Sequence, residues 1–383
     1  MIYLDNAATS WPKPPQVIQA MADFMKRGCA NPGRSAHEMS RQADDAIFHT
    51  RELLAELFHI ADPMRIAFMP NATYGLNMAI HGVLSNGARV VTTMMEHNSV
   101  LRPLKTLENE GRIHLELIEP DKMGRISLQS IKRAVSGSTS LVCMSLSSNV
   151  TGAIMPFADA AKYCRSKDVL FLLDASQGAG VVPIDVESMC IDILVFPGHK
   201  SLLGPQGTGG IYVREGIPLR PIIQGGTGSL SDQLTQPSVY PDALESGTLN
   251  VPGIIGLGKG VSYILDTGIE KIYLKKQQLL ELLFSALEND ERITVFSPPP
   301  EQNSGILSLS IEGMDSAEAG YILNKSFGIY VRNGLHCAPC AHQALGTRNS
   351  GLVRISPGYF NDESDIDLTI KAIQKIAGGM YRE

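Results

Sequence analysis

Short apolar segments alternate with longer amphipathic segments through the first two thirds of this chain. The apolar runs are rich in Val, Ile, Leu and Phe, and the segments between them repeat their apolar positions at helical spacing. This alternation predicts βαβ units around a mostly parallel sheet, and therefore an α/β fold. The seven predicted strands cover residues 65–69, 89–94, 113–118, 140–146, 169–173, 193–196 and 209–213, and clear helical patterns cover 38–58, 73–84 and 157–167.

The pattern changes after residues 225–252, a tract rich in Gly, Ser, Thr and Pro that we interpret as loop. Strands and helices follow in a less regular order, which is typical of a smaller α+β domain. We therefore expect a large domain at 15–257 and a small domain formed by 1–14 and 258–383. Within the second part, helices are predicted at 256–266, 269–289, 316–325 and 363–376, and strands at 293–296, 305–311, 328–332 and 351–356.

Composition and charge narrow the classes of partner. The 383 residues can bury two cores, and 44% hydrophobic with 19% charged residues is ordinary for a globular protein. The net charge of −6 argues against nucleic acid or an anionic membrane as the main partner. No apolar run is long enough to span a membrane, and the first residues lack the pattern of a signal peptide. Six cysteines in a chain of this length fit a reducing cytoplasm, where we expect the protein to reside.

An acid and a lysine follow two of the predicted strands. Asp174 ends one strand, Gln177 comes three residues later, and Lys200 closes Gly-His-Lys after the strand at 193–196. Ligands of open α/β sheets bind at the carboxyl ends of strands. A lysine that forms a Schiff base and an acid that keeps a pyridine nitrogen protonated are what pyridoxal 5′-phosphate (PLP) requires. Taken singly, Asp174 is also compatible with a turn residue and Lys200 with a surface lysine.

Three further segments follow strands and carry suitable side chains. Pro-Asn-Ala-Thr-Tyr-Gly at 70–75 opens a helix, where backbone N–H groups bind phosphate, although Thr73 also suits an ordinary helix cap. His97 is placed to stack on a pyridine ring and to move protons, or to be a polar loop histidine. Asn149 is placed to hydrogen-bond the pyridine O3′ or a substrate, or to form a turn.

Seven short motifs occur in order along the chain: LDNAAT (4–9), NAT (71–73), EH (96–97), SNVTG (148–152), DASQ (174–177), GHK (198–200) and ESGTLN (245–250). They resemble the motifs of the class V aminotransferase family, a group of fold type I PLP enzymes, and the resemblance covers nearly the whole chain. It implies that PLP is held by Ala72, Thr73, His97, Asn149, Asp174, Gln177, His199, Lys200 and Thr248.

The segment VRNGLHCAP at 331–339 is similar to the active-site loop of group II cysteine desulfurases and selenocysteine lyases. The resemblance implies that Cys337 is the nucleophile. The attacking species is a thiolate, and we expect the neighbouring Arg332 and His336 to favour it. The alternative is a structural cysteine. Cys340 completes a Cys-x-x-Cys spacing, but no second such pair completes a zinc site, so no metal site is expected.

The resemblance also assigns substrate contacts and an assembly. Arg354, after a strand of the small domain, matches an arginine that binds the substrate carboxylate, with a surface ion pair as the alternative. His37 matches a position that lines the substrate site. Thr248 matches a threonine that reaches the phosphate of the neighbouring subunit, which implies a C2 homodimer.

The chain departs from the family pattern at Pro197, where related desulfurases carry a serine that binds the phosphate. Proline has neither hydroxyl nor N–H, so we expect Thr73 or Gln206 to compensate. The segment at 228–241 is compact, so docking of a sulfur-acceptor protein is left open.

The resemblance thus implies a cysteine desulfurase that converts L-cysteine to L-alanine and leaves a persulfide on Cys337, with Lys200 and His97 as the other catalytic residues. A selenocysteine lyase acting on L-selenocysteine, a class V aminotransferase and a scaffold without catalysis are the alternatives. Loss of activity in Cys337→Ala separates the first from the second.

Overall fold

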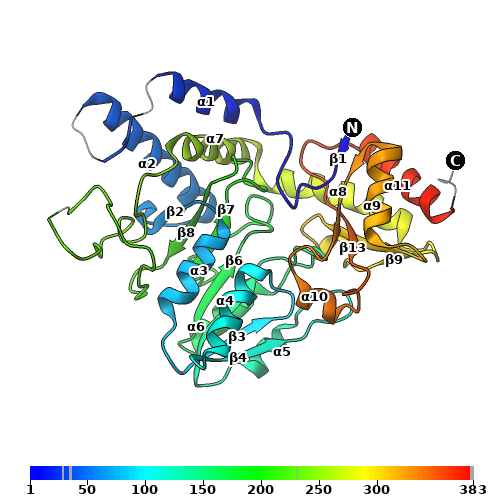
Figure 1. Cartoon of the computed structure of the whole chain (residues 1–383), viewed down its shortest axis with the longest axis horizontal. Coiled ribbons are helices and arrows are strands. Elements are labelled where there is room, and N and C mark those ends of the chain that lie inside the picture. Colours follow the sequence, from blue (N-terminus) through cyan, green and yellow to red (C-terminus); the bar gives the residue numbers. More distant parts are fainter. Residues whose placement is uncertain (28–29, 34–36, 231, 380–383) are drawn as a thin grey trace.

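A seven-stranded mixed sheet forms the centre of the larger part of the chain (Figure 1). The computed structural model describes residues 1–27, 30–33, 37–230 and 232–379. The strand order is β2-β8-β7-β6-β5-β3-β4, and only β8 runs antiparallel to its neighbours. The strands are β2 (Ile66–Met69), β3 (Ala88–Thr93), β4 (Ile113–Ile118), β5 (Thr139–Ser145), β6 (Leu170–Asp174), β7 (Ile193–Pro197) and β8 (Gly209–Val213).

Helices cover both faces of this sheet, which explains why its strands read as continuous apolar runs. Along β6, Phe171 and Leu173 face one core while Leu172 faces the other. One core lies under α2 (Glu38–Phe58), α5 (Leu128–Ala134), α6 (Phe157–Ser166) and α7 (Val251–Thr267), with α1 (Pro15–Lys26) packed on α7, and the other lies under α3 (Ala72–Val83) and α4 (Asn98–Asn109).

The helix α3 packs closely on the sheet, and the side chain of Asn71 caps its N-terminus. A Cβ at Gly75 would lie 2.8 Å from a methyl group of Val195, so only glycine allows this approach of helix to strand. The N-terminus of α3 is capped by the side chain of Asn71, which accepts a hydrogen bond from the backbone N–H of Tyr74 at 3.0 Å. The alternative interpretation of Thr73 as the cap of this helix is therefore wrong, and its hydroxyl instead lies 2.8 Å from that of Ser99.

The smaller part of the chain has its own core and a four-stranded antiparallel sheet of order β12-β13-β10-β9. The N-terminal strand β1 (Ile2–Tyr3) joins this part by pairing in parallel with β11 (Ile329–Tyr330). The remaining elements are β9 (Ile293–Val295), β10 (Leu307–Ile311), β12 (Arg332–Gly334), β13 (Leu352–Ile355), α8 (Ile269–Leu287), α9 (Ser316–Phe327), α10 (Pro339–Ala344) and α11 (Glu363–Ala377).

The predicted α/β class and the seven strands of the large sheet are confirmed. Two details differ in the second part. The strand expected at 328–332 is split, because β11 pairs with the N-terminus and β12 with β13. The helix expected from residue 256 begins at Val251, where Asn250 accepts a hydrogen bond from the N–H of Gly253. Residue 257, the expected domain boundary, falls inside this helix.

Candidate active site

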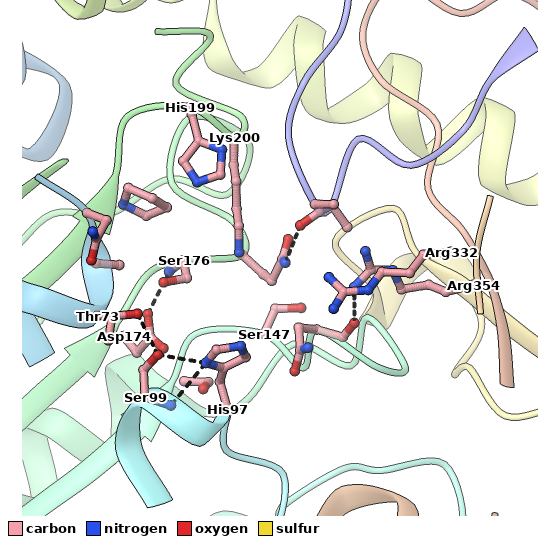
Figure 2. Close-up of a pocket in the computed structure, with 18 residues that line it drawn as sticks. Thr73, His97, Ser99, Ser147, Asp174, Ser176, His199, Lys200, Arg332 and Arg354 are labelled. Carbon is pink, nitrogen blue, oxygen red and sulfur yellow. Dashed lines mark hydrogen bonds between the residues drawn. The ribbon is translucent and has the colours of Figure 1, made fainter. Parts of the chain in front are cut away.

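The carboxyl ends of β5, β6 and β7 meet the N-terminus of α3 at a cavity of about 220 Å³, which is room for a small molecule rather than a single water. Figure 2 shows Lys200 extending into this cavity, with Arg332 and Arg354 facing it from the side of the smaller sheet. Nine residues predicted from the sequence line it: Ala72, Thr73, His97, Asn149, Asp174, Gln177, His199, Lys200 and Arg354.

Lys200 lies three residues beyond β7, and its side chain is desolvated. Burial lowers its pKa to about 8, although the nearby carboxylate of Asp174 partly opposes this shift. Its backbone is held from the N-terminal segment, because the hydroxyl of Ser10 donates to the Lys200 carbonyl at 2.7 Å. With this pKa a minor fraction of the amine is neutral at pH 7 and most of it is neutral above pH 8, and the neutral amine is the nucleophilic form. The surface-lysine interpretation is therefore wrong.

Asp174 is the last residue of β6 and only 2% exposed. Its Oδ1 accepts the backbone N–H of Ser176 at 2.9 Å, which fixes the carboxylate at the strand end. Gln177 ties the N-terminal segment to the same turn, since its Nε2 donates to the carbonyl of Ala7 at 2.9 Å. Besides reversing the chain direction, this turn therefore places the carboxylate of Asp174 at the cavity.

His97 caps α4 and has a defined protonation state. Its Nδ1 accepts the backbone N–H of Ser99 at 3.1 Å, so this nitrogen carries no proton. Burial lowers its pKa to about 4, and the neutral ring therefore carries its proton on Nε2. The Ser99 hydroxyl lies 2.8 Å from both His97 Nδ1 and the Thr73 hydroxyl, which links this histidine to the start of α3.

The acid next to His97 is buried beneath the cavity. Glu96 accepts hydrogen bonds from the hydroxyls of Ser145, at 2.5 Å, and Thr93, at 2.7 Å. Burial nevertheless raises its pKa to about 7, because two hydroxyl donors do not replace the lost hydration. Sequence reasoning used this residue only as part of a motif.

The end of the cavity at α3 suits a phosphate. The backbone N–H groups and the dipole of a helix N-terminus attract anions. Beside it, the imidazole of His199 has a buried Nδ1 with no hydrogen-bond partner. Burial lowers the pKa of this histidine to about 4, so the ring is neutral. Pro197 lines the cavity without a donor, and Gln206 is exposed and lies outside its lining. Among the two residues expected to compensate for the proline, only Thr73 is in place.

Arg354 is held at the opposite end of the cavity and is 1% exposed. One terminal nitrogen donates to the backbone carbonyl of Asn149 and the other to Oδ1 of Asp5, each at 2.9 Å. Its Nε is buried without a partner. The guanidinium is thus fixed rather than solvated, and the surface ion pair considered for it is wrong. Asp5 was not singled out from the sequence, although it belongs to the LDNAAT motif.

Cys337 is exposed and outside the cavity lining, but it contacts a residue that belongs to the lining. A terminal nitrogen of Arg332 lies 3.4 Å from Cys337 Sγ, so the guanidinium is adjacent to the thiol. His336 does not assist in the expected way. Burial lowers its pKa to about 2, so the ring is neutral and supplies no positive charge.

Besides Cys337, two further predicted residues do not line the cavity of this chain. His37 is exposed at the N-terminus of α2, where its Nδ1 accepts the N–H of Ser40 at 3.1 Å. Thr248 is exposed and lines a separate hollow beside Tyr74 and Asn250. The geometry also adds Ser99, Ser145, Ser147 and Ser176. Each lies within a few residues of a strand end, and Ser176 also belongs to the DASQ motif.

Within the described residues, no helix combines the length and apolar character needed to cross a membrane.

The chain is 32% identical to a probable cysteine desulfurase of Methanothermobacter thermautotrophicus over 98% of this chain and 95% of that protein. It is 31% identical to another from Pyrococcus abyssi, covering 98% of this chain and 94% of the relative.

The fold also resembles a solved structure, the apo form of cysteine desulfurase from Thermococcus onnurineus NA1. The TM-score is 0.92 at 29% identity, covering 99% of this chain and 95% of that one. The likeness confirms the prediction of a fold type I architecture. A family model described as aminotransferase class-V matches residues 2–369. The chain therefore belongs to the class V aminotransferase family.

Proposed function

We propose that this protein is a PLP-dependent cysteine desulfurase that converts L-cysteine to L-alanine and transfers the sulfur to Cys337. One observation carries the proposal. The desolvated Lys200, the buried Asp174 and the fixed Arg354 line one cavity. The exposed thiol of Cys337 contacts Arg332, a second arginine of that lining. The relatives named cysteine desulfurase support the choice of reaction within the family.

The cavity fits PLP at both ends. His199 Nδ1 lacks a partner next to the α3 N-terminus, where Ala72 and Thr73 would hold the phosphate, and Lys200 would bind the aldehyde carbon. Asp174 would accept the pyridine N–H, and the remaining cofactor contacts would come from His97, Gln177 and Asn149. When bound, PLP supplies an electron sink for the pair of electrons released at the substrate Cα.

Three residues of the cavity lining would have separate roles in the reaction. Arg354 would hold the substrate carboxylate, because its charge is buried and its orientation is fixed by Asp5 and Asn149. Lys200, whose amine has a pKa of about 8 and is neutral at higher pH, would take the Cα proton. His97 carries its proton on Nε2 and can donate it within the cavity.

Cys337 would perform the sulfur transfer. Its thiolate, which lies beside the Arg332 guanidinium, would attack the substrate sulfur and form an S–S bond while the C–S bond breaks. The electron pair of the C–S bond stays with carbon, which takes up a proton and becomes the methyl group of alanine. The terminal sulfur of the resulting persulfide is exposed with Cys337, and a sulfur-acceptor protein would collect it there.

We further propose that the protein works as a homodimer in a reducing compartment, the cytoplasm. Exposed apolar side chains at Ile222, Ile223, Leu234 and Val239 belong to the same irregular tract as Thr248, which is what a subunit interface requires. The five cysteines of the described residues are all free thiols. Sedimentation of the purified protein tests the dimer.

The experiment that tests the function uses purified enzyme, Cys337→Ala and Lys200→Ala. We expect visible absorbance from the lysine-bound cofactor in the first two proteins and its loss in Lys200→Ala. Wild type should release equal amounts of alanine and sulfide from L-cysteine in the presence of a thiol reductant, and Cys337→Ala should release neither. Undiminished sulfide release from Cys337→Ala would overturn the persulfide mechanism. A strong preference for L-selenocysteine that survives this change would instead assign a selenocysteine lyase.

A further inference from the structure

A buried chain of two histidines and a threonine lies behind the cysteine loop, and the proposed reaction does not use it. His336, directly before Cys337, is 2% exposed, His342 in α10 is fully buried, and Thr347 is 5% exposed. The two rings stack with centroids 5.4 Å apart and planes inclined by 30°. Buried polar groups of this kind are retained only when their hydrogen bonds are satisfied.

The direction of each hydrogen bond in this chain follows from its end. His336 Nε2 lies 3.4 Å from the backbone carbonyl of Arg332, which can only accept, so Nε2 carries the proton. In the neutral ring Nδ1 is then an acceptor, and His342 Nε2, at 3.2 Å, must be its donor. His342 Nδ1 is left as an acceptor, and the hydroxyl of Thr347 donates to it at 2.8 Å.

This arrangement satisfies all four ring nitrogens and requires both rings to be neutral. Burial supports that state, because it lowers the pKa of His336 to about 2 and that of His342 to about 4. Removal of the Thr347 hydroxyl or of the His342 ring leaves a buried nitrogen without a partner. The chain therefore holds the ring of His336 in one orientation.

The backbone at this point needs such a restraint. His336 and Cys337 both adopt left-handed conformations, with φ of 51° and 58°, which non-glycine residues avoid. Two hydrogen bonds from the large sheet side oppose relaxation. Asn149 Nδ2 donates to the His336 carbonyl at 2.7 Å, and the N–H of Asn98 donates to the Cys337 carbonyl at 2.9 Å. Unusual backbone persists where the surroundings over-determine it, and it concentrates at functional sites.

We propose that His342 and Thr347 are positioning residues for the nucleophile: through His336 they hold the 336–337 backbone so that Cys337 Sγ faces Arg332 at the cavity. Without the hydrogen bonds from His342 and Thr347, the backbone of His336 and Cys337 relaxes towards ordinary φ values, and Cys337 Sγ loses its contact with the Arg332 guanidinium. As a role in the sulfur-transfer step, this inference rests on the proposed function. The substrate carboxylate, held by Arg354, is not affected.

The test compares His342→Leu and Thr347→Val with the conservative variants His342→Gln and Thr347→Ser, all in a Cys340→Ser background. Gln restores a donor near the position of Nε2, and Ser keeps the hydroxyl. We expect kcat for L-cysteine to fall about tenfold or more in the first two variants while KM stays within about twofold, because positioning acts on the reacting atom and not on binding. The conservative variants should recover most of the loss.

A second measurement does not depend on turnover. Cys337 in the cofactor-loaded enzyme is alkylated with iodoacetamide at neutral pH, and the modified residue is located by mass spectrometry. Because the thiolate is the reacting species and Sγ would leave the Arg332 guanidinium in these variants, alkylation should slow about threefold or more in His342→Leu and Thr347→Val and return to the wild-type rate in the conservative pair.

The outcomes separate the two proposals. Equal alkylation and equal persulfide formation in wild type and Thr347→Val would overturn the positioning role. If wild type forms no persulfide, the proposed function fails, while the alkylation rates still decide whether the histidine chain orients Cys337. If His342→Leu does not fold, Thr347→Val, which removes only one hydroxyl, decides the question alone.

Discussion

The ion pair between Arg51 and Glu245 lies beneath the strand that leads to the proposed phosphate site, and it offers a sharp test of the structure. Both side chains are nearly buried, at 5% and 6% exposure, and Arg51 approaches Glu245 Oε2 to 2.6 Å. Glu245 Oε1 also accepts the backbone N–H of Phe68 on the edge strand β2. Arg51 adds a hydrogen bond to the carbonyl of Ile66 and lies 4.6 Å from the ring centroid of Phe68.

Glu245→Ala should therefore destabilise the protein strongly. It leaves a buried guanidinium without its counter-charge, which costs about 3–5 kcal/mol, and also exposes an unpaired N–H on β2. With about 2.1 cal/mol/K of unfolding entropy per residue, 383 residues give about 0.8 kcal/mol/K, so a loss of about 4 kcal/mol lowers Tm by about 5 °C. Calorimetry and urea titration at saturating cofactor measure both quantities.

Two control variants identify the cause. Glu108→Ala removes a partner from an ion pair of the same 2.6 Å length, with Lys105, but both side chains are substantially exposed, so Tm should change by less than about 1 °C. The double variant Arg51→Met/Glu245→Leu removes both charges and should recover much of the loss. The reasoning is refuted if Glu245→Ala costs no more than Glu108→Ala, or if the double variant is no more stable than Glu245→Ala.

Three other predictions follow from single groups. Because burial lowers the pKa of Lys200 to about 8, the rate at which cofactor-free protein binds added PLP, followed by absorbance, should rise with pH up to about 8 and then level off. Because burial raises the pKa of Glu96 from 4.5 to about 7, the folded state binds more protons than the unfolded state between these values, and wild type loses stability as pH rises through this window. Glu96→Gln should lose less between pH 5 and 8 in urea titrations, and parallel curves would contradict the assignment. Gly152→Ala should cost about 3 kcal/mol, because φ is 77° and a Cβ would lie 2.2 Å from the buried Oδ1 of Asn303, whereas Gly87→Ala, with an open site at similar φ, should cost about 1 kcal/mol.

Most of the large sheet could be predicted because its signal is local. Residues such as Phe171, Leu172 and Leu173 are apolar on both faces, and each run stops at a polar residue or a turn. The short elements could not be predicted in this way. β1 is two residues long and exists because Ile2 and Tyr3 find Ile329 and Tyr330 as partners, a pairing with no periodicity to reveal it.

The candidate site was predictable to the extent that it follows strand ends. Asp174, His97 and Lys200 all come at or just after the carboxyl end of a strand, where an α/β sheet places its ligands. Protonation states were not accessible in the same way. His336 looked like a source of positive charge beside Cys337, but burial and the N–H of His342 that donates to its Nδ1 keep it neutral.

By itself, the sequence determined the α/β class, the order of the strands along the chain and several polar residues at the strand ends, because periodicity and strand ends are properties of neighbouring residues. The tertiary structure decided which of them act together. Arg354 is paired with Asp5 across 349 residues, Arg332 reaches Cys337, and two histidines fix each other's protons behind the nucleophile. The first contact depends on the docking of the N-terminal segment beside β13, where Asp5 forms a bridge with Ser356. The protonation of the two histidines depends on burial, which no local pattern encodes.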